Sequence, residues 1–167
     1  SGHARRAPRS DSVNRTALLA TLHCLTGCAI GEVLGLMIGT ALGWGTPETI
    51  GLAVTLAFLF GYAFTMVPLL RAGLPARAAL RLALAADTAS IAVMEVTDNA
   101  VMLAVPGAMQ AGLDSMVFWA SLAAALLIAA VIAFPVNRWL IARGRGHAVA
   151  HAMHGHPPQA GHIETGA

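Results

Sequence analysis

The chain has 167 residues, of which 57% are hydrophobic and 11% are charged, and its formal net charge is +2. Its mean hydropathy of +0.70 excludes an ordinary soluble domain and favours an integral membrane protein. All ten basic residues are arginines placed beside apolar segments, which argues against the basic stripe of a nucleic-acid-binding protein.

Four apolar segments follow a short basic arm. Residues 1–15 carry four arginines and little to bury, so we expect this arm to be disordered. The predicted spans cover residues 16–43, 48–70, 76–105 and 113–141, each long enough to cross about 30 Å of hydrocarbon as a helix. The sequence therefore predicts an all-α, four-transmembrane-helix bundle over residues 16–142, with a flexible tail over residues 143–167.

The arginines predict the orientation of these spans. They lie in the arm, at residues 71–81 and at the C-terminal end of the fourth span and just beyond it, whereas the other two connections contain none. By the positive-inside rule, both termini and the middle connection face the cytoplasm. An even number of spans agrees with this partition.

An ionisable stripe runs along the first span. Cys24, Cys28 and Glu32 stand four residues apart and therefore share one helix face. Because such groups cost about 2.5–3.5 kcal/mol each in hydrocarbon, a functional site is the default interpretation. Two thiolates suit a soft metal ion, with His23 as a further ligand, whereas i, i+4 spacing is too wide for an intrahelical disulfide.

The same span carries glycines at every fourth position. This small-xxx-small pattern is typical of membrane helices that pack closely against a neighbour, within the chain or between copies of it. We expect the third span to be that neighbour. The predicted packing positions are Gly27, Gly31, Gly35 and Gly39.

The third span has a matching polar stripe. It combines carboxyl and thioether side chains, namely Asp87, Met94, Glu95, Asp98 and Met102, and the same span also carries the amide Asn99. Because the first and third spans run in the same direction, we expect Asp87 near the depth of Cys28, and Glu95 and Asp98 nearer that of Glu32. Met94 and Met102 are candidate metal ligands, and the four carboxyls and Asn99 are candidate charge or proton partners.

The sulfur-containing residues and the tail can also be interpreted without any functional role. Buried free cysteines and methionines often serve only to fill a core. The tail is rich in histidine, a ligand for borderline divalent metals, but it is also a plausible solvated end. Its candidate ligands are His147, His151, His154 and His156.

Residues 23–32 (HCLTGCAIGE) and 94–99 (MEVTDN) resemble an uncharacterised bacterial family of small four-helix integral membrane proteins, a domain of unknown function. The His-Cys-x-x-Gly-Cys segment of the first span is the distinctive part. The resemblance extends over residues 16–142 and implies a four-helix membrane fold, but it brings no catalytic residues.

These patterns favour a multi-pass protein of the bacterial inner membrane that is not an enzyme. The leading hypothesis is that it binds and translocates copper(I) or zinc along a Cys/Met/carboxylate path between the first and third spans. One alternative is a structural or assembly subunit that packs through its glycines, as a homo-oligomer (dimer or trimer) or in a larger membrane complex. A lower-ranked alternative is a membrane thiol oxidoreductase.

Overall fold

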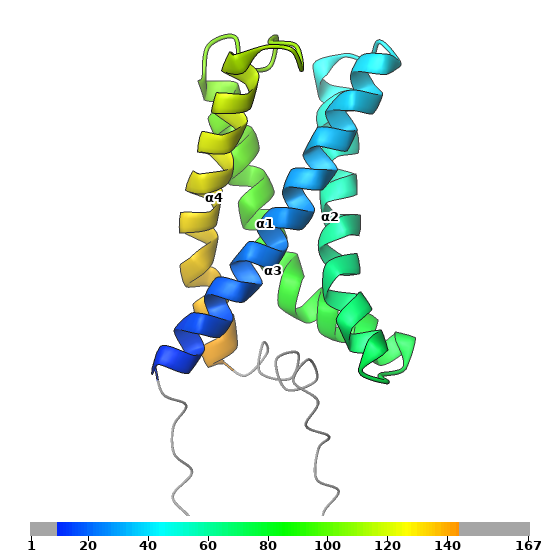
Figure 1. Cartoon of the computed structure of the whole chain (residues 1–167), viewed down its shortest axis with the longest axis vertical. Coiled ribbons are helices and arrows are strands. Elements are labelled where there is room, and N and C mark those ends of the chain that lie inside the picture. The colour runs from blue at the N-terminus through cyan, green and yellow to red at the C-terminus, as the bar shows by residue number, and fades with distance from the viewer. Residues whose placement is uncertain (1–9, 144–167) are drawn as a thin grey trace, which may run out of the picture.

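The computed structural model describes residues 10–143, which form four helices joined by short connections (Figure 1). Successive helices run in opposite directions and stand side by side as a bundle, which confirms the all-α prediction of four helices. The helices are α1 (Ser10–Ala41), α2 (Thr46–Arg71), α3 (Ala76–Ala104) and α4 (Met116–Ala142).

The ends of the helices follow local chemistry. Helix α1 begins at Ser10, so the last residues of the predicted disordered arm are helical, while residues 1–9 lie outside the described part. Helix α4 begins three residues later than predicted, because the Ser115 hydroxyl accepts a hydrogen bond from the Val117 N–H (3.2 Å) and caps the first turn. The Trp119 indole donates to the Leu113 carbonyl (2.7 Å) and holds the preceding connection against this turn.

Helix α1 contacts each of the other three helices, as does α3. Helix α2 lies against one side of it, α4 lies against another, and α3 completes the ring by packing on both α2 and α4. A buried hydrogen bond from Asn137 to the Thr21 hydroxyl (2.9 Å) joins α4 to α1. The direct α1–α3 contact brings together the two helices that carry the ionisable residues.

The glycines of α1 pack against α2, and the expectation that α3 would be their neighbour is wrong. A Cβ added to Gly27 would lie 2.8 Å from the Gly61 Cα, and one added to Gly35 would lie 2.5 Å from the Ala53 Cα. Gly31 and Gly39 face Ala57 and Thr49 in the same way. Helix α2 is the partner because it also has a small residue at every fourth position, so the two backbones approach closely.

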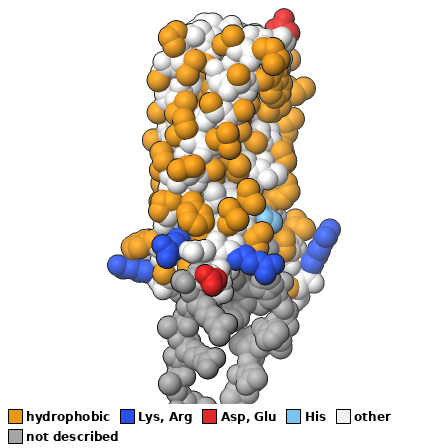
Figure 2. Space-filling model, turned by 60° about the vertical axis from the view of Figure 1, so that its left-hand side comes forward, with side chains coloured by type: hydrophobic (Ala, Val, Ile, Leu, Met, Phe, Trp, Pro, Cys, Tyr) orange, Lys and Arg blue, Asp and Glu red, His pale blue; other side chains and the backbone are white. Residues whose placement is uncertain are grey.

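The outer surface of the bundle is apolar. Figure 2 shows hydrophobic side chains over the side of the bundle and arginines gathered in a belt at one end of it. Large side chains such as Val96 and Val131 are more than two-thirds exposed (72% and 74%). Helices α1, α2 and α4 are long and apolar enough to cross a membrane, whereas α3 carries too many ionisable residues to meet the same description.

Candidate functional site

A buried column of polar side chains lies between α1 and α3. Near its middle, Cys24 and Cys28 share one buried cluster with Ile91 and Met94 of α3. Alanines of α2 and α4 close the same cluster, since Ala57, Ala129 and Ala133 belong to it. The thiols are free and 3% and 1% exposed. The two polar stripes therefore meet within one chain.

The column has three successive levels. At the level nearest the arginine belt, Cys24 lies beside Asp87 and Ser90. At the next level Cys28 lies beside Glu95. Farthest from the belt, Glu32 lies beside Asp98.

This pairing differs from the expected depths by one helical turn. Asp87 is level with Cys24 instead of Cys28, and Glu95 is level with Cys28 instead of Glu32. Asp98 lies near Glu32 as expected. The difference arises because α1 begins at Ser10, so depths counted from a start at residue 16 are misplaced.

The four carboxyl groups of the column are buried. The exposed fractions of Glu32, Asp87, Glu95 and Asp98 lie between 2% and 7%. Within the described residues, both oxygens of Glu95 and of Asp98 lack a hydrogen-bond partner, as do one oxygen of Glu32 and one of Asp87. These carboxyls face one another and the side chains of Cys24, Cys28 and Thr65. An unpaired buried carboxylate is costly, so such a column calls for protons or bound cations.

Sulfur side chains are the metal donors that the column brings together. In residues 10–143, no group of three or more His, Cys, Asp or Glu side chains is placed to hold a metal ion. Two thiols with the nearby Met94 thioether form a smaller, softer donor set, of the kind that selects copper(I).

His23 is not brought to the thiols. Its ring lies edge-on to Phe64 of α2, and its Nε2 donates a hydrogen bond to the Phe64 carbonyl (3.1 Å). Pro68 explains this contact, because proline has no N–H to offer the carbonyl four residues earlier. His23 is thus engaged with α2 in this structure and is separated from the other predicted ligands.

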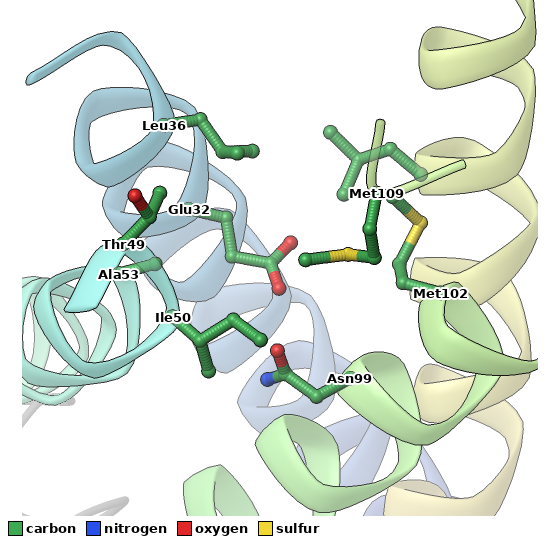
Figure 3. A pocket seen from close by; sticks show the side chains of 9 residues that line it. Glu32, Leu36, Thr49, Ile50, Ala53, Asn99, Met102 and Met109 are labelled. Atoms are coloured by element: carbon green, nitrogen blue, oxygen red, sulfur yellow. The ribbon is translucent and has the colours of Figure 1, made fainter. Parts of the chain in front are cut away.

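Asn99, Met102 and Glu32 meet at the end of the bundle away from the arginine belt. They line a small cavity there together with Met109, which comes from the connection between α3 and α4 (Figure 3). Met109 was missed in the sequence because a residue in a connection has no helical face from which to predict its direction. The tail candidates His147, His151, His154 and His156 lie outside the described residues.

Two other polar neighbours of the column were also missed. Ser90 is fully buried beside Cys24, and its position three residues after Asp87 already places it on the α3 stripe. Thr65 lies beside Asp87 from α2. Its role depends on which face of α2 points into the bundle. The sequence does not predict that face, because α2 is apolar on almost every side.

The four helices and the buried polar column between α1 and α3 belong to one continuous stretch of the chain. A family model, the domain of unknown function (DUF4396), matches residues 13–146, which span all four helices. The chain belongs to the DUF4396 family. Every residue of the column lies inside the DUF4396 match. No curated protein and no solved structure matches the chain.

The DUF4396 match confirms that the chain belongs to an uncharacterised family. The bacterial source and the diagnostic value of the His-Cys-x-x-Gly-Cys segment stay predictions.

Proposed function

We propose that this DUF4396 protein binds a soft transition-metal ion, copper(I) before zinc, and moves it along the column between α1 and α3. The observation that carries the proposal is the buried cluster in which Cys24, Cys28 and Met94 meet beside Glu95. Thiolate and thioether sulfurs together are the donor set that favours copper(I).

The carboxyls have a natural part in such a function. A cysteine must lose its proton to bind a metal as thiolate, so metal binding releases protons. Asp87 lies near Cys24 and Glu95 lies beside Cys28. When it is ionised, each of these carboxylates can accept the proton that the neighbouring thiol releases. Binding of a cation and uptake of the displaced proton then occur at the same level of the column.

The proposal places all four helices across a bacterial inner membrane. Helix α3 is the most polar, but its carboxyl-bearing face is buried against the other helices, while apolar residues such as Val96 and Leu103 face outward. A helix of this kind can cross hydrocarbon because its bundle shields its polar groups. Both termini would lie on the cytoplasmic side with the arginine belt.

The alternatives have less support. A subunit that assembles through its glycines needs those glycines free, but α2 of the same chain covers them. A thiol oxidoreductase needs a thiol that a partner disulfide can reach, whereas both thiols are buried and stand on successive turns of one helix.

Copper(I) binding to purified protein tests the proposal. The full chain in detergent is titrated with copper(I) against a chromophoric copper(I) chelator, and the double variant Cys24→Ala/Cys28→Ala is compared with wild type. We expect the variant to lose its tightest-bound copper, because both thiolate donors are gone. Zinc competition in the same assay ranks the two ions.

The matched control is Ala129→Ser, which alters polarity in the same buried cluster without removing a thiol. It should retain the full copper stoichiometry. If the double variant binds copper as tightly and to the same stoichiometry as wild type, the proposal fails.

A further inference from the structure

A cavity of about 20 Å³ lies at the end of the bundle away from the arginine belt. It has contributions from every helix and from the α3–α4 connection, and it includes Glu32, Asn99, Met102 and Met109 in its lining. A space of this size holds about one water molecule or one dehydrated ion. It is well separated along α1 from Cys24, which lies two helical turns before Glu32.

Two hydrogen-bond acceptors are available to this cavity. Glu32 is 5% exposed, and its Oε2 lacks a hydrogen-bond partner among residues 10–143. The Asn99 amide donates its Nδ2 to the Glu95 carbonyl (2.9 Å), which leaves Oδ1 as the group it offers to the cavity. Figure 3 shows the Glu32 carboxylate directed away from α1 into the space above Asn99. A water molecule, a proton or a cation between these acceptors would satisfy both.

The side chains on the other walls of the cavity indicate which of these three occupants fits best. Figure 3 shows the Met109 side chain reaching toward the Glu32 carboxylate from the opposite wall, with Met102 behind it. Met102 is 4% exposed, and both methionines belong to the cluster that includes Phe118 and Leu122. Water gains little from thioether sulfurs, which are weak acceptors, whereas a soft metal ion is bound by them.

We propose that Glu32, Asn99, Met102 and Met109 form a second metal site, which takes a soft monovalent ion of the copper(I) class. Glu32 is the carboxyl residue in the lining and supplies a negative charge for the ion, and the two thioethers supply the soft donors. A hard ion such as magnesium would find too few oxygen ligands here.

The second site deepens the proposed function. It rests on that function for the identity of copper(I) as the cargo, but its ligands are distinct from the thiols. An ion leaving Cys28 would pass Glu95 and Asp98 before it reached Glu32. The thioether site is then the last metal site on this path before the end of the bundle that lies away from the arginine belt.

Silver(I), an air-stable probe of copper(I) sites, tests the second site. The full chain in detergent is equilibrated with silver(I) by dialysis, and bound silver is counted by mass spectrometry. We expect Met102→Leu/Met109→Leu to bind one silver ion per chain fewer than Met37→Leu/Met116→Leu. The control pair also loses two thioethers, but Met37 and Met116 are half or more exposed. Glu32→Gln keeps the shape of the side chain, removes the charge and should weaken the same silver ion.

The outcomes separate the two proposals. Equal silver binding by the two methionine pairs, or unchanged binding in Glu32→Gln, overturns the second site. Loss of one silver ion in Met102→Leu/Met109→Leu supports it. If Cys24→Ala/Cys28→Ala binds as much silver as wild type, the thiol site of the proposed function fails, whatever the methionine variants show.

Discussion

The imidazole of His23 replaces a backbone donor that α2 lacks. Pro68 leaves the Phe64 carbonyl without its helical N–H, and His23 of α1 donates to it instead. In hydrocarbon there is no bulk water to take over this role. In this structure His23, a metal-ligand candidate from the sequence, therefore serves as a hydrogen-bond donor to α2.

Replacing His23 should cost more stability when Pro68 is present than when it is replaced. His23→Ala leaves the Phe64 carbonyl unpaired, so we expect a loss of about 1–3 kcal/mol in unfolding free energy. In a Pro68→Ala background the restored N–H serves the carbonyl, and the loss should shrink by about 1 kcal/mol or more. Thermal or denaturant unfolding in detergent, followed by helix content, measures the four proteins of this cycle.

His23→Gln is the matched control, because an amide can still donate to the carbonyl. It should lie between wild type and His23→Ala. If His23→Ala costs the same in both backgrounds, the histidine does not compensate for the proline.

Helical periodicity predicted which polar residues would share a face, but not everything that those faces would meet. Cys24, Cys28 and Glu32 lie on one stripe because the helix repeat alone decides it. The contact between His23 and Phe64 joins residues far apart in sequence, and the direction of Met109 depends on a connection. Such features depend on tertiary packing, which does not appear as a periodic pattern in a single sequence.

The sequence contained a pattern from which the packing of α1 against α2 could have been predicted. Gly27, Gly31, Gly35 and Gly39 identify α1 as a close-packing helix, and the partner shows the same spacing. Small residues recur in α2 at Thr49, Ala53, Ala57 and Gly61, all of them buried. Comparing the two runs would have selected α2 instead of α3, because close approach requires small residues on both helices.

A single methyl group on this interface should be strongly destabilising. In Gly35→Ala the new Cβ would lie 2.5 Å from the Ala53 Cα, so the helices must separate or shift. We expect a loss of about 1–3 kcal/mol in unfolding free energy, typical of overpacked cores. Thermal unfolding in detergent measures it.

Gly51→Ala provides the matched control on α2, because a Cβ at Gly51 meets nothing within 4 Å. It should be neutral or stabilising by up to about 1 kcal/mol, since alanine is the better helix former. Equal destabilisation of the two variants would contradict the close-packing explanation.

At the level of the whole molecule, the charge distribution predicts how the bundle lies in a membrane. The arginines of residues 10–143 lie at the start of α1, around the α2–α3 connection and at the end of α4, and Figure 2 shows one belt. Because helices alternate in direction, these segments share one end of the bundle. The four-helix fold was predictable because each apolar segment is long and the connections are short.

Reporter fusions should show that α3 crosses the membrane. Green fluorescent protein fused after Gly73 or Arg143 should fluoresce in the cytoplasm, whereas alkaline phosphatase fused after Gly107 should be active outside it. The reason is that four crossings return the chain to the side of the arginine belt. If both reporters place Gly73 and Gly107 on the same side, α3 does not cross, and the polar column cannot be a path through the membrane.

The regular spacing of small residues has a consequence for the register of α1 on α2. Because both helices repeat every four residues, a slide of four residues, about 6 Å, would again set small residue against small residue. Shape alone therefore fits several registers. Two features occur only once: the His23–Phe64 hydrogen bond and the short turn over residues 42–45, where Trp44 N–H bonds to the Gly39 carbonyl (2.9 Å). They select one register, and with it the level at which each thiol meets its carboxyl.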